Sequence, residues 1–570
     1  MDSQLDGSTW SHQKVFSLIL AFRLVNALTI RTFFQPDEYF QSLEPAWELA
    51  FGLRAKAWIT WEWHHRLRSS LHPFFFSAVY MIAGRAAQAL SLSTANHSAL
   101  LIAAPKLTQA IFATCTDYFT WRLGATLFGE KSAAARASLL TTVSNPWQWF
   151  CSTRTFSNSI ETTLTAFALS KWPWELPAIA CVLRPTNLLV WVCVASMSLL
   201  RAANVDRLFL VFSAALYGLL VLSISVLLDR AYYGAWTMPA LRFLGLNVGQ
   251  SVASFYGRNR SDYYLTEGIP LLLTTALPFA VHGVVSSLKP VRSGVTAQES
   301  VKHQTLKTLS YTCVLVTIAF SSIPHKEVRF LYPLLPAFIV LSAPSIAHFV
   351  DRAKRSNRYR PAAFVMMGLN VAIAIYTTQF HQRGVVDAVH FLRQQYEMSA
   401  FTDRPSPAIS AVFLMPCHST PWRSHLVYAD INAWALTCEP PIGLPEDTRA
   451  GYLDEADQFY DDPHSWLLSN MADDEGTIRR DRSNAGRDGS RSNESTIPGQ
   501  RGPGQDKRPW PEYLVFFEQL EDSLLPFKSD LGYETRQKFF NTHWHDDWRR
   551  KGDVVIWHRP QPVVDSIANQ

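Results

Sequence analysis

Charged residues are scarce in this chain. They make up 17% of its 570 residues, against about 25% in an average soluble protein. Hydrophobic residues reach 48% and aromatic residues 13%. This balance excludes an ordinary soluble protein and predicts a polytopic membrane protein. The mean hydropathy is nevertheless zero, so a polar region must offset the apolar segments. That region begins near residue 380 and continues to the end of the chain.

Strong positive charge and cysteine-rich motifs are also missing. The formal net charge is only +5, and the basic residues are scattered between apolar segments, which argues against nucleic acid as a partner. Of seven cysteines, only Cys417 and Cys438 lie in the polar tail. They can pair if the tail lies in an oxidising compartment. No Cys or His spacing typical of a metal site is present, so we expect neither a metal nor another cofactor.

Apolar runs recur along residues 15–379 and predict about eleven membrane-spanning helices. The first run, at residues 15–31, contains Arg23. A charge inside a lipid-crossing helix is costly unless it meets a partner or a wet cavity. The other runs lie at residues 73–92, 99–121, 134–151, 155–171, 175–199, 207–228, 267–285, 306–323, 328–349 and 361–379.

The loop at residues 351–360 orients these spans. It holds five basic residues and one acidic residue, a bias typical of the cytosolic side of a membrane. Counting spans from this loop predicts that residues 1–14 are also cytosolic. The same count predicts that the loops 32–72 and 229–266 and the tail 380–570 lie on the opposite, luminal side.

The tail has the pattern of a small luminal α/β domain. Residues 409–415, 513–517 and 554–558 read as strands, separated by Pro, Asp and aromatic residues. Residues 472–508 are rich in Asp, Arg, Gly and Ser and have almost no large apolar residues. We therefore expect them to form a disordered insertion.

Two adjacent carboxylates, Asp37 and Glu38, follow the first apolar run directly. A carboxylate at the membrane surface can stay ionised while it faces a substrate whose tail lies in lipid, so the pair has catalytic potential. A structural interpretation is also open. Pro36 suits the first position of a helix, where two acidic residues would stabilise the positive end of the helix dipole.

Two groups of cations lie on the side of the membrane predicted for Asp37. His325, Lys326 and Arg329 are in a short turn between two apolar runs, and His64 and Arg66 are in an aromatic and basic segment after the acidic loop. Such residues can hold an anionic lipid headgroup. They can equally be ordinary interfacial residues, with long side chains that reach the water and tryptophans at headgroup depth.

Short motifs recur along the chain, at residues 34–41, 71–73, 153–159, 183–187 and 325–330. They resemble those of the dolichyl-phosphate-mannose-dependent mannosyltransferases of the GT-C clan. Two further segments, at residues 414–425 and 436–441, are similar to the tail of the branch that adds the third mannose of the glycosylphosphatidylinositol (GPI) anchor. Gln35 stands where many relatives have His, which leaves the role of that His open.

The resemblance implies a GT-C-type, multi-pass enzyme of the endoplasmic reticulum membrane with a luminal active site and two lipid substrates. Mannose would pass from dolichyl phosphate mannose to the 2-hydroxyl of the second mannose on the GPI precursor. The α-1,2 link would form with inversion. Asp37 would be the base, with Glu38 as second choice or as a positioning group. The leaving phosphate would be stabilised by His325, Lys326 and Arg329 or by His64 and Arg66.

Two alternatives differ in acceptor or in class. A related enzyme could extend the lipid-linked oligosaccharide, against which residues 415–425 argue. A non-enzymatic lipid or sugar transporter typically shows repeated halves and broken midplane helices. We find no repeat in this sequence, and the ionisable clusters lie at the ends of the predicted spans.

Overall fold

A computed structural model describes residues 11–171, 178–246, 255, 257–290, 294, 296–399, 409–442, 451–472 and 507–560. Most of the predicted insertion at 472–508 falls outside these residues. The chain divides into two compact units. The first comprises Met1–Ile30, Glu62–Ala83 and Leu101–Thr378, and the second comprises Arg31–Trp61, Gly84–Leu100 and Gln379–Gln570.

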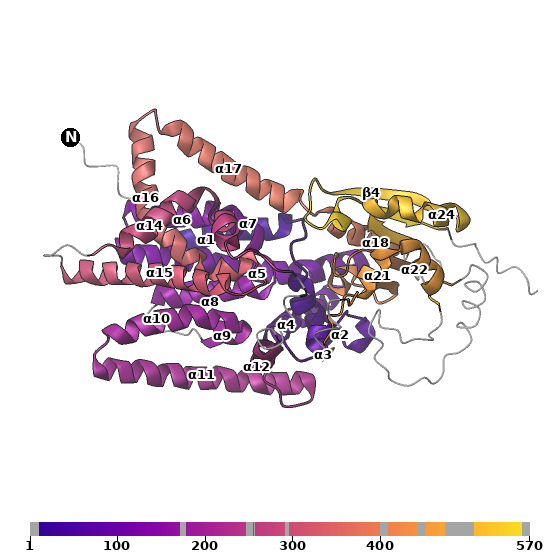
Figure 1. Cartoon of the computed structure of the whole chain (residues 1–570), viewed down its shortest axis with the longest axis horizontal. Coiled ribbons are helices and arrows are strands. Elements are labelled where there is room, and N and C mark those ends of the chain that lie inside the picture. Colours follow the sequence, from indigo (N-terminus) through magenta and orange to yellow (C-terminus); the bar gives the residue numbers. More distant parts are fainter. Residues whose placement is uncertain are drawn as a thin grey trace, which may run out of the picture. The chain divides into compact units, whose positions relative to one another are not determined.

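The first unit is helical (Figure 1). Small residues allow its helices to pack closely: a Cβ atom added at Gly283 of α14 would lie 2.1 Å from the carbonyl oxygen of Leu341 in α16. Its helices are α1 (His12–Thr29), α3 (Trp61–His64), α4 (Leu71–Ala89), α5 (Thr94–Phe128), α6 (Ala133–Ser144), α7 (Pro146–Cys151), α8 (Ser157–Lys171), α9 (Ala178–Leu183), η3 (Pro185–Asn187), α10 (Leu188–Arg201), α11 (Asn204–Tyr233), α12 (Pro239–Leu244), η6 (Tyr264–Gly268), α13 (Ile269–Leu273), η7 (Thr274–Ala276), α14 (Leu277–Leu288), α15 (Ala297–Ser321), η8 (Val328–Leu334), α16 (Leu335–Arg355) and α17 (Arg360–Gln379), with residues of α3, α4, α5 and α17 shared with the second unit.

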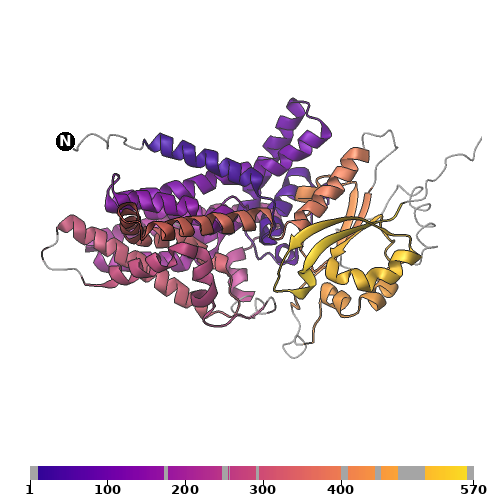
Figure 2. The same cartoon turned by 90° about the horizontal axis from the view of Figure 1, so that it is seen from above.

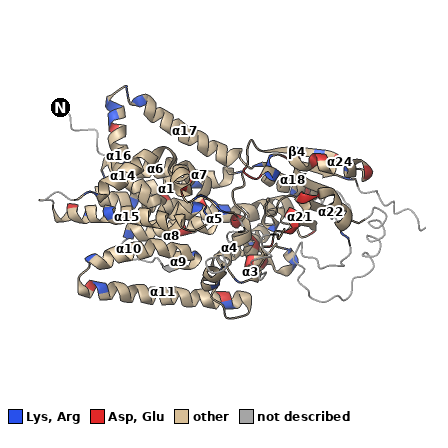
Figure 3. Cartoon of the chain, in the orientation of Figure 1, with Lys and Arg blue, Asp and Glu red and all other residues tan. Residues whose placement is uncertain are grey.

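Five helical stretches in the described part of the chain are long and apolar enough to cross a membrane. The charged residues of α11 lie near its two ends, and Arg360, the one charged residue of α17, lies at the start of that helix, so the middle of each helix is uncharged (Figure 3). This distribution is typical of a membrane span. The mostly helical membrane fold is therefore confirmed, while the count of about eleven spans stays a prediction. The five stretches are Thr94–Phe128, Asn204–Tyr233, Tyr264–Leu288, Val328–Arg355 and Arg360–Ser399, and Pro185–Arg201 is a shorter apolar helix.

Some of the predicted apolar runs are divided into shorter helices. The run at 134–151 breaks between α6 and α7, where the side chain of Asn145 accepts a hydrogen bond from the backbone N–H of Gln148 at 2.9 Å. Pro146 then opens α7. A capping side chain followed by proline starts a new helix without lowering the local hydrophobicity, so an apolar-run criterion reads both helices as one.

Arg23 has the partner that its position in an apolar helix requires. Its Nε donates to Asp117 Oδ2 at 2.7 Å, and both side chains are fully buried. Gln148 and Thr142 donate to the other carboxylate oxygen of Asp117 at 2.9 and 3.1 Å. The pair ties α1 to α5, as expected for a charge that cannot be left alone in an apolar region.

The second unit contains a five-stranded sheet with helices on both faces (Figure 2). The strand order is β2-β1-β3-β5-β4; β1 is parallel to β2 and β3, and β5 is antiparallel to β3 and β4. The three predicted strands are confirmed, and the small α/β domain is present. The elements are η1 (Tyr39–Leu43), α2 (Glu44–Phe51), η2 (Leu53–Ala55), α18 (Gly384–Ser399), β1 (Ile409–Leu414), α19 (Arg423–Leu426), β2 (Ile431–Ala435), α21 (Glu455–Asp461), α22 (Pro463–Asn470), β3 (Tyr513–Phe517), η9 (Glu518–Leu520), α24 (Glu521–Asp530), β4 (Glu534–Thr542), η10 (Trp548–Arg550) and β5 (Gly552–His558).

Alternate residues of the central strands face opposite sides of this sheet. Leu514 and Trp557 belong to a core with side chains of α21, α22 and α24, such as Phe459. On the other face, Phe413 of β1 packs edge-on against Trp422 with their ring centres 5.5 Å apart. This second face carries the segment that leads to the candidate site.

Candidate functional site

Asp37 and Glu38 lie in the first turn of a short helix. The backbone carbonyl of Pro36 accepts hydrogen bonds from the N–H groups of Tyr39 and Phe40, each at 2.9 Å. The helix then continues through η1 into α2. The structural interpretation of the acidic pair is thus confirmed, since both carboxylates lie at the positive end of a helix.

The two carboxylates differ in exposure. Asp37 is half-buried, whereas Glu38 is 5% exposed. A general base must come within hydrogen-bond distance of the proton that it removes. The exposures therefore favour Asp37 over Glu38 as the group that meets a substrate.

Residues 415–428, which we call the tail segment, pack against the helix that begins after Pro36. The ring of His418 lies 4.4 Å from the ring of Phe40, centre to centre. The ring of His425 meets Tyr39 edge-on at 5.2 Å. All these residues belong to the second unit. The tail segment and the acidic turn therefore form one local structure, although they are far apart in the sequence.

Glu44, in α2, is the polar link between these two parts. Its side chain is fully buried and accepts hydrogen bonds from the backbone N–H groups of Ser424 at 2.8 Å and Trp58 at 3.2 Å. Burial raises the pKa of Glu44, and the two backbone donors and Arg423 oppose the rise. Arg423 is also buried and donates to the carbonyl oxygen of Lys56 at 3.3 Å. Sequence analysis missed Glu44, because its partner is 380 residues away.

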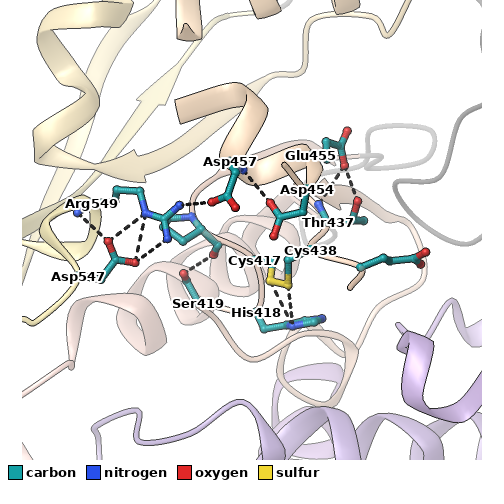
Figure 4. Close-up of a disulfide and its surroundings, with 12 residues drawn as sticks. Cys417, His418, Ser419, Thr437, Cys438, Asp454, Glu455, Asp457, Asp547 and Arg549 are labelled. Atoms are coloured by element: carbon teal, nitrogen blue, oxygen red, sulfur yellow. Dashed lines mark hydrogen bonds and ion pairs between the residues drawn. A yellow bond between two sulfur atoms is a disulfide. The ribbon is translucent and has the colours of Figure 1, made fainter. Parts of the chain in front are cut away.

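A disulfide between Cys417 and Cys438 holds the tail segment (Figure 4). His418 follows directly and has a φ of 55°, a left-handed conformation that few residues other than glycine adopt. Its Nδ1 lies 3.5 Å from the sulfur of Cys417 and 3.7 Å from that of Cys438. Trp58 flanks the same imidazole, with the ring centres 4.8 Å apart. The disulfide therefore fixes the imidazole beside the acidic turn.

The imidazole of His418 is held in its neutral form. Burial is the largest cause, and together with the charge of Arg550 it lowers the pKa of His418 to about 3, while the charge of Asp37 acts in the opposite direction. The charge of Asp37 affects the pKa of His418 because the two side chains lie close together. Around neutral pH, His418 therefore adds a polar but uncharged ring to the surroundings of Asp37.

Cys417, His418 and Cys438 also form a group whose ligand atoms lie within 4.8 Å of one another, as a metal site would require. The two sulfurs, however, are bonded to each other. Zinc is bound by cysteine as the thiolate, and a disulfide supplies none. The residues present in this oxidised form do not fit a metal, and metal-independent catalysis stays a prediction.

The turn at residues 325–329 is built around Glu327. Arg329 donates to both carboxylate oxygens of Glu327, at 2.6 and 2.9 Å, and the Nε2 of His325 lies 3.1 Å from the same carboxylate. Lys326 is 4% exposed, and its ammonium donates to the carbonyl oxygen of Asn259 at 3.2 Å. The turn thus brings His325 and Arg329 to one carboxylate, while Lys326 is held by a backbone carbonyl.

The charges in this turn stabilise one another. Burial alone would raise the pKa of Glu327, but the guanidinium of Arg329 and the hydrogen bond from His325 hold it well below its usual range. Glu327 is therefore ionised at neutral pH and offsets part of the positive charge. A fixed, partly compensated arginine is a suitable receptor for phosphate, because its orientation is set before the ligand arrives.

Three motif segments that are separate in sequence meet at Glu161 in α8. Its Oε2 lies 3.3 Å from the Nε of Arg184 and accepts from Asn158 at 3.1 Å, and its Oε1 accepts from Asn187 at 2.9 Å. Asn158 also donates to the backbone carbonyl of Arg329 at 3.2 Å. Sequence analysis identified all three segments as motifs but missed Glu161, which lies just outside them.

The second predicted cation group is more exposed. His64, at the end of α3, is exposed, and Arg66 is partly exposed with a φ of 57°. The neighbouring Arg68 pairs with Glu62 at 2.7 Å. Their predicted contact with a lipid phosphate stays a prediction. Asp37 and Glu38 belong to the second unit and the predicted cations to the first, so their joint action on a substrate is likewise a prediction.

The model of the Alg9-like mannosyltransferase family matches residues 14–427 of this chain. The chain belongs to this family. It is therefore a glycosyltransferase, and the matched region contains both the acidic turn and the tail segment up to Val427. The expectation of a mannosyltransferase, drawn from the motifs, is confirmed.

Named relatives cover almost the whole chain. The protein is 45% identical to GPI mannosyltransferase 3 of Aspergillus fumigatus, over 95% of this chain and 76% of that protein. It is 43% identical to GPI mannosyltransferase 3 of Emericella nidulans, over 98% and 80%. Identity to the mouse GPI alpha-1,2-mannosyltransferase 3 is 32%, over 95% and 88%. These names agree with the branch indicated by residues 414–425 and 436–441.

Proposed function

We propose that this Alg9-like mannosyltransferase adds the third mannose of the GPI anchor. It would transfer mannose from dolichyl phosphate mannose to the 2-hydroxyl of the second mannose on the GPI precursor. The observation that carries the proposal is the similarity, over 95% of the chain or more, to fungal and mouse proteins named for this step. The packing of the branch-specific tail segment against the acidic turn supports it.

The chemistry of the proposed step requires one base and a stabilised leaving group. The donor is β-linked and the product α-linked, so the sugar is inverted in a single displacement. Asp37 removes the proton from the acceptor hydroxyl as its oxygen attacks the anomeric carbon. The bond to the phosphate oxygen breaks, and dolichyl phosphate leaves with the electron pair. A phosphate leaves readily, so no general acid is needed.

The cations of the turn at 325–329 are the proposed stabilisers of the departing phosphate. Arg329 can form the bidentate, charge-assisted hydrogen bonds that phosphate favours. His325 and Lys326 are further proposed stabilisers from the same turn, and His64 and Arg66 are the alternative set. Such groups accelerate the reaction when they are in place before the charge develops.

The disulfide supports a luminal site in the endoplasmic reticulum. Disulfides persist in oxidising compartments and are rare in the cytosol. The tail segment that carries Cys417 packs against the turn that carries Asp37, within one unit. The proposed base therefore belongs on the same side of the membrane as the disulfide, away from the basic loop at 351–360.

The direct test is an acceptor assay in microsomes that contain the protein as their only source of this activity. We expect labelled mannose to pass from dolichyl phosphate mannose to a GPI precursor with two mannoses, and depletion of the protein to accumulate that precursor. Transfer only to a lipid-linked oligosaccharide would assign the protein to N-glycosylation instead. Movement of a lipid or sugar across the membrane, with no mannose transferred to either acceptor, would favour the alternative of a non-enzymatic transporter.

A further inference from the structure

We infer that Glu161 is a positioning residue that holds Arg184 and, through Asn158, Arg329 in the orientation needed to receive the phosphate of the lipid donor. This inference rests on the proposed function. It adds Arg184 to the predicted donor site and gives a role to a buried carboxylate outside the motifs.

The first step of the argument is the saturation of Glu161. Its side chain is 3% exposed, and its two oxygens are shared among Arg184, Asn158 and Asn187 at 2.9 to 3.3 Å. Asn187 is itself fixed, because its Oδ1 accepts from the indole of Trp191 at 2.8 Å. The carboxylate therefore has one orientation and transmits it to each of its partners.

The second step is that one amide joins Glu161 to the turn at 325–329. The Nδ2 of Asn158 donates both to Glu161 and to the backbone carbonyl of Arg329. A change at Glu161 therefore reaches the backbone from which the side chain of Arg329 projects. The guanidinium of Arg329 is also held by its two hydrogen bonds to the carboxylate of Glu327.

The third step is the common position of the two guanidinium groups. Arg184 and Arg329 both lie over the ring of Phe330, with their central carbons 5.7 and 5.8 Å from its centre. Each guanidinium is held by a carboxylate, Glu161 for one and Glu327 for the other. Two arginines that lie over one aromatic ring, each with its guanidinium held by a carboxylate, are suited to bind the oxygens of a phosphate.

A purely structural role explains this arrangement less well. Taking a carboxylate and an arginine out of water costs more than their attraction returns unless the geometry is excellent, and apolar side chains often stabilise such positions better. Arg23 and Asp117 show what a structural pair looks like in the same unit. There the printed partners of Asp117 are Arg23, Thr142 and Gln148, and none of these three residues belongs to the predicted donor site.

The test separates donor recognition from folding. In Glu161→Gln, shape is kept but charge is lost. We expect the KM for dolichyl phosphate mannose to rise about tenfold, the size of one lost charge-assisted hydrogen bond, with kcat and the KM for the acceptor within about twofold. Glu161→Asp, which keeps the charge, should recover part of the loss. The matched control Asp117→Asn removes a buried carboxylate from an arginine and should lower the amount of folded protein while leaving the donor KM unchanged.

A direct binding measurement keeps the inference distinct from the proposed function. Purified protein in detergent is titrated with dolichyl phosphate, and the rise in unfolding temperature is followed. If the wild type binds this lipid and Glu161→Gln binds it equally well, or loses only folded protein, Glu161 does not position the donor site. If the wild type neither binds dolichyl phosphate nor uses its mannose ester, the proposed function itself is wrong.

Discussion

The proposed role of Asp37 as the base rests on its place in the first turn after Pro36. There its side chain lies at the start of a helix, and its partial exposure leaves it accessible to a hydroxyl. We predict that Asp37→Asn lowers kcat by about a hundredfold or more, the usual contribution of a general base. Glu38→Gln, at a buried position, should mainly lower the amount of folded protein. Transfer rates per mole of folded enzyme check both; an Asp37→Asn enzyme with full activity would remove Asp37 from the mechanism.

His418 makes the second unit sensitive to acid. Its pKa is near 6.5 in an unfolded chain and about 3 in the folded protein, so the unfolded state takes up a proton first as the pH falls. The stability that His418 contributes is complete above pH 6.5 and is lost as the pH falls toward 3, with about 2 kcal/mol lost at pH 5.

The corresponding measurement compares unfolding temperatures at pH 7.5 and pH 5. We expect the drop to be smaller in His418→Asn, because asparagine does not titrate and tolerates a positive φ. Equal drops in the wild type and the variant would show that His418 is not buried in its neutral form.

Residues of the site differ in how visible they are to sequence reasoning. Asp37 and Arg329 lie in contiguous motifs, so the local pattern identifies them. Glu161, Glu44 and His418 acquire their roles from partners that only the fold brings near; Glu44 meets a backbone donor 380 residues away. A buried carboxylate carries no local signal of what it binds.

At the scale of elements, the tail segment depends on its disulfide. Cys417 and Cys438 are 21 residues apart, and a bridge that closes a loop of this size stabilises a protein by about 3 kcal/mol. We predict that replacing both cysteines with serine lowers the unfolding temperature and reduces transfer per mole of folded enzyme, because His418 is no longer fixed beside Phe40. Calorimetry and the acceptor assay check this. If the folded variant transfers mannose at the wild-type rate, the disulfide contributes to stability and not to activity.

The strands of the sheet also differ in how well the sequence predicts them. β1, β3 and β5 occupy the centre of the sheet and read as apolar runs, so the sequence predicts them. β2 and β4 are its two edges, and seven of the nine residues of β4 are partly or fully exposed, with only the last two buried. An edge strand buries less apolar surface, so its composition does not separate it from a loop.

At the scale of the whole molecule, the proposed function requires the acidic turn and the basic loop to lie on opposite sides of the membrane. Arg31 and Asn357 are both exposed and suit substitution by cysteine for labelling. In sealed microsomes, we predict that a membrane-impermeant maleimide labels Asn357→Cys at once and Arg31→Cys only after permeabilisation. Labelling of Arg31→Cys in sealed vesicles would contradict a luminal site.

The second unit is assembled from Arg31–Trp61, Gly84–Leu100 and Gln379–Gln570. A disulfide joins two points of its last part, Cys417 and Cys438, next to His418. During synthesis, the ribosome therefore makes Asp37 long before the residues that complete its environment. The disulfide can form only after both Cys417 and Cys438 have been made. A nascent, truncated or wrongly inserted chain would remain unable to consume the cell's activated sugar, so activation is coupled to successful delivery of the polypeptide.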